Sequence, residues 1–188
     1  EALSKWNKET TTNEILEGLD LSGKKVLVTG ASGGLGEETA RALAAAGASV
    51  IMAARDNTKN LEAKERILSS NSEAKLELHE LNLASLEDVR SSAEEFLSKN
   101  ESLDLLVYNA GIMCTPFGHT TDGFEQQFGV NHLGHYLFTG LMMPALEKSG
   151  ASRVVCLSSG AHLICGVNLD DPMFERRDYD GWDSYGQS

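Results

Sequence analysis

The sequence contains few cysteines and few basic residues. Cys114, Cys156 and Cys165 are too sparse for a disulfide framework and lack metal-ligand spacing, so we expect buried free thiols in a reducing compartment. Only 16 Lys and Arg stand against 28 Asp and Glu, which gives a net charge of −12. That charge offers no attraction for nucleic acid or for an anionic membrane surface, and neither is expected as a partner.

Long apolar runs are absent as well. The most apolar stretch, residues 42–54, contains Gly47 and Ser49 and is shorter than the roughly 20 residues of a transmembrane helix. The first residues, from Glu1 onward, have no apolar run with a small-residue cleavage site, so they do not resemble a secretory signal. We expect an intracellular protein without a transmembrane segment, cytoplasmic unless a preceding segment carries an organelle address.

The composition that is present is that of one globular domain. Of the 188 residues, 41% are hydrophobic and 23% are charged, which excludes a disordered or collagen-like chain. Thr11 and Glu14 have the spacing of a capping box and predict a short helix over residues 14–19. We therefore expect an amino-terminal extension over residues 1–22 and a single domain over residues 23–188.

Apolar strands and amphipathic helices alternate through that domain. The expected strands are residues 24–29, 49–54, 76–81, 103–108 and 153–158. The expected helices are residues 35–46, 56–70, 85–99 and 121–146, with Phe138, Met142 and Met143 in the core. This order predicts a doubly wound α/β fold, in which helices cover both faces of a parallel sheet. Residues 160–183 have no such pattern and indicate a long surface loop.

A glycine-rich turn, Thr29-Gly30-Ala31-Ser32-Gly33-Gly34-Leu35-Gly36, joins the first expected strand to its helix. In doubly wound folds this turn lets the backbone approach a pyrophosphate, which the N–H groups at the helix start can bind. Side chains at Gly34 and Gly36 would obstruct that approach. The turn therefore predicts a dinucleotide at Gly30, Ser32, Gly33, Gly34, Leu35 and Gly36, with a plain strand-to-helix turn as the alternative.

The second expected strand ends in Ala53-Ala54-Arg55. An acidic residue at this point of a dinucleotide fold selects NAD through the ribose hydroxyls. Ala54 carries no carboxylate, and the cation of Arg55 can pair with a ribose phosphate. NADP(H) is therefore the preferred cofactor, while NAD(H) remains an option because Asp56 follows directly. A solvated arginine at the start of a loop is the alternative for Arg55.

Four further motifs follow the glycine turn in order. They are Asn109-Ala110-Gly111 after the fourth strand, Asn131 in the long helix, Ser159 after the fifth strand, and Tyr185-Gly186-Gln187-Ser188. Together with the turn, they resemble the short-chain dehydrogenase/reductase family. The amino-terminal helix, the segments around Asn131 and Ser159, and the interval from Ser159 to Tyr185 resemble its retinol dehydrogenase and WW-domain oxidoreductase branch.

The resemblance implies an oxidoreductase that interconverts an alcohol and a carbonyl by hydride transfer, on a retinoid-, steroid- or lipid-like small molecule. Tyr185 would exchange the hydroxyl proton, Ser159 would hydrogen-bond the substrate oxygen, and Asn131 would hold a water that relays protons. His162 is the next candidate for the acid/base role. No metal is expected, because His132 and His135 lack a third ligand.

The resemblance also assigns nucleotide contacts outside the glycine turn. Asn109, Ala110 and Gly111 would border the nicotinamide ribose. Asn82 and Leu83 would lie at the adenine, where Asn82 replaces the usual aspartate of the family.

The family motif Tyr-x-x-Ser-Lys places a lysine directly after Ser188, where this chain ends. We therefore expect that the carboxyl-terminal part of the domain is missing, that the 188 residues alone are inactive, and that residues 153–158 form an unpaired edge strand. A nucleotide-binding or interaction protein without turnover is the alternative function. The oligomeric state is left open, with a homodimer as one option for the complete domain.

Overall fold

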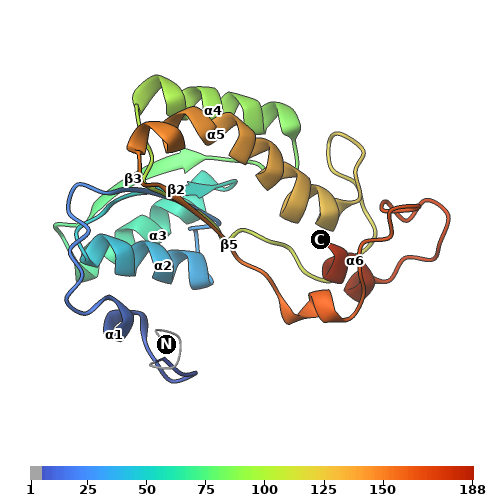
Figure 1. Cartoon of the computed structure of the whole chain (residues 1–188), viewed down its shortest axis with the longest axis horizontal. Coiled ribbons are helices and arrows are strands. Elements are labelled where there is room, and N and C mark those ends of the chain that lie inside the picture. Colours follow the sequence, from blue (N-terminus) through green and yellow to red (C-terminus); the bar gives the residue numbers. More distant parts are fainter. Residues whose placement is uncertain (1–5) are drawn as a thin grey trace.

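The computed structural model describes residues 6–188 (Figure 1). Its five strands form one parallel sheet in the order β3-β2-β1-β4-β5. The strands are β1 (Lys25–Thr29), β2 (Ser49–Ala54), β3 (Lys75–Glu80), β4 (Leu105–Tyr108) and β5 (Arg153–Cys156). The order reverses between β1 and β4, which opens a crevice at the carboxyl ends of these two strands. The predicted doubly wound sheet is confirmed.

Helices cover both faces of the sheet, as Figure 1 shows. Helices α2 (Gly34–Ala45) and α3 (Asn57–Ser70) lie on one face, and α4 (Leu86–Lys99) and α5 (His135–Ser149) lie on the other. Each face encloses its own core. Ala40, Ala44 and Ala63 pack closely against β1 and β2 on the first face, whereas Phe96 and Phe138 fill the second. These short and long side chains set how near each helix layer approaches the sheet.

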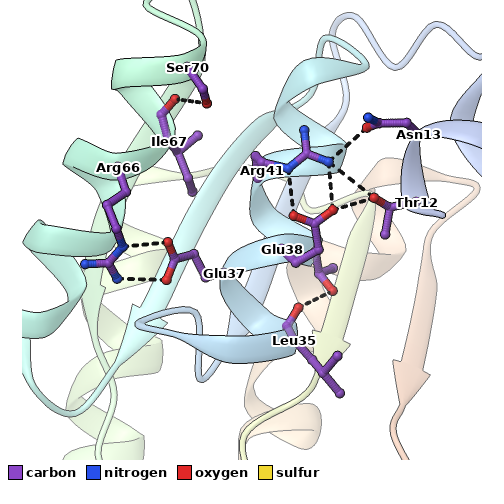
Figure 2. A network of polar contacts seen from close by, with 10 residues as sticks. Thr12, Asn13, Leu35, Glu37, Glu38, Arg41, Arg66, Ile67 and Ser70 are labelled. Atoms are coloured by element: carbon purple, nitrogen blue, oxygen red, sulfur yellow. Dashed lines mark hydrogen bonds and ion pairs between the residues drawn. The ribbon is translucent and has the colours of Figure 1, made fainter.

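The amino-terminal helix α1 (Thr12–Leu16) begins at the predicted capping box, two residues earlier than expected. The Thr11 N–H donates to Glu14 Oε2 at 2.7 Å, and the Glu14 N–H donates to Thr11 Oγ1 at 3.3 Å. Helix α1 lies against α2, to which Arg41 and Glu38 connect it (Figure 2). Residues 1–5 of the predicted extension, including those compared with a secretory signal, lie outside the described residues.

The long helix differs from its prediction. A π-helical segment, η2 (Phe128–Gly134), leads into α5, and residues 121–125 are a turn instead of a helix. Gly123 takes a φ of +84°, which breaks a right-handed helix, and the buried Glu125 carboxylate accepts hydrogen bonds from the N–H groups of Gln127 and Phe128. The helix therefore starts after Glu125, and it ends at Gly150 with a φ of +77°.

The segment 160–183 is more ordered than the predicted surface loop. It contains the 3₁₀ turn η3 (Gly160–Leu163) and leads into α6 (Gly181–Gln187). Between them, the buried Asp171 carboxylate accepts the N–H groups of Glu175, Arg176 and Arg177. These charge-assisted bonds hold the loop compact without regular secondary structure.

Two predictions about burial are wrong, and one about the edge of the sheet is confirmed. Met143 is 40% exposed, because it points away from the face of α5 that buries Phe138 and Met142. None of the three cysteines is the buried thiol that was expected: Cys114 and Cys165 are half-buried, and Cys156 is exposed because β5 lies at the edge of the sheet. Within residues 6–188, β5 pairs with β4 alone. No helix in this part of the chain has the length and apolar character needed to cross a membrane.

Candidate functional site

A cavity of about 520 Å³ lies at the carboxyl ends of β1, β2 and β4. Of the residues predicted to bind the dinucleotide, all but Gly34 and Gly36 line it: Gly30, Ser32, Gly33, Leu35, Arg55, Asn82, Leu83, Asn109, Ala110 and Gly111. The strand order brings these residues together, because β1, β2 and β4 are neighbours although β3 separates them in sequence. This is where doubly wound folds bind ligands.

The glycine turn is shaped partly by close contacts within the protein. A Cβ at Gly36 would lie 2.2 Å from Gly30 O and 2.4 Å from Asn109 Nδ2, so only glycine fits. Gly34 has a φ of +56° with no protein atom within 4 Å of an added Cβ, which leaves open space beside the turn. The Gly36 position is thus required by packing against Asn109, in addition to the reason expected from the sequence.

The start of α2 is suited to an anion. Gly33 precedes the helix and provides no side chain to cap it, so the first N–H groups have no capping partner from that residue. Gly33 and Leu35 at this helix start line the cavity. Helix N-termini of this kind attract phosphate through those N–H groups and the helix dipole. The turn therefore fits a dinucleotide pyrophosphate.

Thr29 joins the glycine turn to β4 and to the long helix. Its Oγ1 accepts hydrogen bonds from Asn109 N at 3.1 Å and from Ala110 N at 3.0 Å. The same oxygen lies 3.0 Å from His135 Nε2, and His135 Nδ1 lies 2.9 Å from Asn131 O. One threonine hydroxyl thus holds the Asn109-Ala110 backbone at the crevice.

At the other end of the cavity, Arg55 is exposed and Ala54 is buried. The carboxylate of Asp56 caps α3, because its Oδ1 accepts the Lys59 N–H at 3.1 Å. Asn82 is bonded within the protein: its Nδ2 donates to Asp88 Oδ2 at 2.8 Å and its Oδ1 accepts the Ala84 N–H at 3.2 Å. The cation of Arg55 therefore faces the cavity while the neighbouring carboxylate is occupied.

A second cavity, of about 630 Å³, contains all three predicted catalytic residues, Asn131, Ser159 and Tyr185, and also His162. Five residues line both cavities: Leu35, Asn109, Ala110, Gly111 and Ile112. The two cavities therefore meet at the segment that follows β4. A ligand in the first cavity can reach a group held in the second.

Asn131 is the most constrained of the three. Its Oδ1 accepts the Ile112 N–H at 2.8 Å, and its Nδ2 donates to Ile112 O at 2.9 Å and to Ser188 Oγ at 2.8 Å. It lies in the middle of the π-helical segment η2, a distortion common at functional sites. Its side chain therefore joins the post-β4 segment to α6.

Ser159 and Tyr185 are both half-buried at the second cavity. Ser159 Oγ accepts the Ala161 N–H at 3.2 Å, so this residue also caps η3. Tyr185 extends from α6, with its ring centroid 6.3 Å from that of Trp182. Two residues with hydroxyl groups lining one cavity are an arrangement that can bind and protonate a substrate oxygen.

These features match a known family. A family model for short chain dehydrogenase matches residues 24–168, which include the glycine turn, Asn109, Asn131 and Ser159. The chain belongs to the short chain dehydrogenase family. Tyr185 lies beyond the matched residues 24–168. Its place in the site therefore depends on the relatives and on the geometry of the second cavity.

Relatives of the chain include short chain dehydrogenases of the expected branch. It is 42% identical to retinol dehydrogenase 12 of Mus musculus over 170 residues, which are 90% of this chain and 54% of that protein. It is 45% identical to WW domain-containing oxidoreductase of Gallus gallus over 158 residues, 84% of this chain and 38% of that protein. The chain thus spans about half the length, or less, of these relatives.

Solved structures agree with this assignment. A protein from Mycobacterium paratuberculosis is 40% identical, with a TM-score of 0.81, covering 95% of this chain and 61% of that one. A short chain dehydrogenase from Escherichia coli CFT073, in complex with NADPH, is 25% identical with a TM-score of 0.68, covering 88% and 64%. The short chain dehydrogenase fold therefore includes nearly all of the described residues.

Sequence reasoning missed several buried polar residues of this short chain dehydrogenase site. Gln127 and Glu125 have no exposed surface, and His135 is 6% exposed. Gln127 and His135 lie four residues before and after Asn131, so one helix face carries all three. That spacing was visible in the sequence, but the partners of these side chains are distant along the chain.

Proposed function

We propose that the protein is an NADP(H)-dependent oxidoreductase that interconverts an alcohol and a carbonyl by hydride transfer. The observation that supports this best is the wall shared by the two cavities at Asn109, Ala110 and Gly111. A nucleotide in the first cavity would extend along this wall toward Ser159 and Tyr185. Nicotinamide, when bound, supplies or accepts the hydride.

The residues of the chain would handle the oxygen and its proton. Ser159 Oγ would donate a hydrogen bond to the substrate oxygen and orient it. Tyr185 would give its phenolic proton to that oxygen during carbonyl reduction and take it back during alcohol oxidation. Asn131, tied to Ile112 and Ser188, would keep the two walls of the cavity together.

A tyrosine needs nearby positive charge to exchange its proton near neutral pH, because a phenol ordinarily has a pKa of about 10. No Lys or Arg from the described residues 6–188 lines the second cavity. We therefore propose that these 188 residues by themselves bind the nucleotide without turning over substrate, and that catalysis needs a cation supplied within the whole protein.

The cofactor preference proposed for the first cavity is NADP(H) over NAD(H). Arg55 lines the cavity with its cation free of the Asp56 carboxylate, which caps α3. Lys59 lines the same end. Asp56 lines this end as well, but its carboxylate caps α3 and lies 4.0 Å from Lys59 Nζ. The cation of Arg55 is therefore the group that favours a ribose phosphate over a ribose hydroxyl pair.

The substrate class proposed is a retinoid-, steroid- or lipid-like molecule. The second cavity carries apolar side chains around the hydroxyl pair, including Met113 and Leu157, which are 57% and 49% exposed. Retinol dehydrogenase 12 is among the relatives, and its name states its substrate. We also propose that residues 1–22 are an amino-terminal extension and residues 23–188 a nucleotide-binding domain. Helix α1 of the extension contacts α2 of the domain.

The direct test measures NADPH oxidation by the whole protein with a retinoid aldehyde and with a short aliphatic aldehyde. Turnover with the retinoid in the presence of NADPH supports the proposal, and a clear excess over NADH supports the cofactor preference. The opposite result is a protein that binds NADPH but turns over neither aldehyde with NADPH nor retinol with NADP⁺. That result would support the alternative of a nucleotide-binding protein without catalysis.

A further inference from the structure

Gln127 has a fully buried side chain amide that connects three separate segments. Its Oε1 accepts the Cys114 N–H at 2.8 Å. Its Nε2 donates to Tyr179 Oη at 2.9 Å and to Gly181 O at 3.0 Å. Both hydrogens of the amide and one lone pair of its oxygen are used, so the side chain has a single position with all its donors satisfied.

Gln127 repeats, one helical turn earlier, what Asn131 does. Asn131 joins Ile112 to Ser188, and Gln127 joins Cys114 to Gly181. Each amide therefore links the segment after β4 to α6. Asn131 holds α6 near its carboxyl end, and Gln127 holds it at its first residue.

Tyr185 lies between these two attachments, one turn after Gly181 on α6. Helix α6 has only seven residues, and a helix of that length is not stable without tertiary contacts. A Cβ at Gly181 would lie 3.3 Å from Cys114 Cα, which means that the start of α6 approaches the post-β4 segment closely. The position of Tyr185 therefore depends on what holds Gly181, together with the bonds that Asp183 and Gln187 make later in α6.

The backbone of Gln127 is itself held. The buried Glu125 carboxylate accepts the Gln127 N–H at 3.0 Å and the Phe128 N–H at 2.8 Å. Tyr179, the second partner of the Gln127 amide, donates its hydroxyl to Thr115 O at 2.9 Å. Both ends of the connection are thus anchored in the body of the domain.

We propose that Gln127 is a positioning residue for the reaction: it holds α6 so that Tyr185 stays in the cavity that Ser159 also lines. This inference rests on the proposed function. Gln127 lines neither cavity, so it acts through α6 and not by touching substrate or nucleotide. A shift of about 1 Å in a proton-transfer group can lower the rate by up to about a hundredfold, so losing this connection should reduce turnover and spare nucleotide binding.

The test replaces Gln127 with Met, which has a similar length and no hydrogen bonds, in the whole protein. We expect kcat to fall about tenfold or more while the Kd for NADPH changes by less than about twofold. Amide hydrogen exchange over residues 181–187 should become faster, while exchange in β1 and β2 stays as in the wild type.

The matched control is Asn60→Leu. Asn60, in α3, is another fully buried amide, and it donates to Met52 O at 2.7 Å in β2. This variant should lose thermal stability without losing kcat or changing exchange over residues 181–187. An equal fall in kcat for Asn60→Leu, or an unchanged kcat for Gln127→Met, would overturn the inference.

The test also covers a variant that does not fold and a wild-type protein that shows no turnover. If Gln127→Met does not fold, Gln127→Asn makes the same comparison, because its shorter amide cannot reach both Cys114 N and Gly181 O. If the wild-type protein shows no turnover, the proposed function fails on its own. Hydrogen exchange then still decides whether Gln127 holds α6, and unchanged exchange in the variant would reject the positioning role.

Discussion

Thr29 Oγ1 and His135 Nε2 lie 3.0 Å apart beneath the nucleotide crevice, although 106 positions separate them in sequence. His135 Nδ1 faces Asn131 O, which can only accept, so Nδ1 carries the proton and Nε2 accepts from the Thr29 hydroxyl. Burial lowers the pKa of His135 to about 4, against the hydrogen bond to Asn131 that raises it. The imidazole is therefore neutral at pH 7.

The neutral His135 makes folding sensitive to mild acid. In the unfolded chain His135 is protonated below the ordinary histidine pKa near 6.5, whereas in the folded chain it stays neutral down to about pH 4. The free energy of unfolding therefore falls as the pH drops from about 6.5 to about 4. The full loss is on the order of 3 kcal/mol. The free energy of unfolding, measured by urea titration, should be lower at about pH 5 than at about pH 7, and His135→Gln should reduce this difference. His119→Gln, at an exposed site that does not contact this network, should leave the difference unchanged. An unaltered pH dependence in His135→Gln would contradict the assignment.

Arg55 should determine the cofactor preference. We expect wild-type protein to bind NADPH more tightly than NADH, and Arg55→Ala to remove most of that difference, because an exposed charge-assisted contact to the ribose phosphate is lost. The expected change is about tenfold in the Kd ratio, equivalent to about 1.4 kcal/mol. Fluorescence titration with both nucleotides measures it, with Arg90→Ala on the surface of α4 as control. Equal affinities in the wild type would exclude the preference.

Tyr185→Phe should abolish turnover in the whole protein and leave NADPH binding nearly intact, because only the proton-transfer hydroxyl is removed. Initial rates and nucleotide titration on the same preparation separate the two effects. Trp182→Phe, which changes an exposed neighbouring ring on α6, should retain most of the activity. Turnover retained within a few-fold in Tyr185→Phe would move the acid/base role, with His162 next to test.

Arg41 should hold the amino-terminal helix on the domain. Its guanidinium bonds Glu38 on α2 at 2.7 Å and reaches Asn13 at 2.9 Å and Thr12 at 3.2 Å on α1 (Figure 2). The bond from Arg41 lowers the pKa of Glu38 to about 2. Arg41→Ala should therefore release α1, lower stability by about 1 kcal/mol and speed tryptic cleavage at Lys8.

Figure 2 also provides the control for this prediction. Arg66 makes a paired contact of 2.8 Å to each oxygen of Glu37, which joins α2 to α3 without touching α1. Arg66→Ala should cost similar stability without faster cleavage at Lys8. Equal cleavage rates in Arg41→Ala and wild type would show that other contacts hold α1.

The edge strand β5 should drive association when residues 1–188 are produced alone. Val154 and Val155 are 40% and 44% exposed, and an open apolar edge is a template for another strand. Val155→Lys should shift the sedimentation profile toward monomer. Leu19→Lys, at a 55% exposed apolar site outside the sheet, should not. A monomeric wild-type polypeptide at high concentration would contradict this prediction.

The local features of this protein could be read from its sequence, because neighbouring residues decide them. The capping box at Thr11 and the Asp56 and Ser85 caps all work within four residues, and the structure has each of them. The glycine turn was also visible in the sequence, although its Gly36 is required in addition by packing against the distant Asn109. The alternation of strand and helix predicted the parallel sheet, since buried strands need crossover helices. The nucleotide residues followed, because the carboxyl ends of β1, β2 and β4 had to meet at one edge.

What the tertiary structure decided depends on contacts between residues that are far apart in the chain. The long helix was predicted to start at residue 121, but it starts after Glu125, whose buried carboxylate accepts the Gln127 N–H. Glu125 is held there by two distant residues: Tyr179 donates its hydroxyl to the carboxylate, and Met173 Sδ accepts the Glu125 N–H. Gln127 reaches Gly181 across 54 positions, and Thr29 reaches His135 across 106. No local propensity encodes these pairs. Their hydrogen bonds form only once burial excludes water, when an unpaired amide or imidazole would be costly.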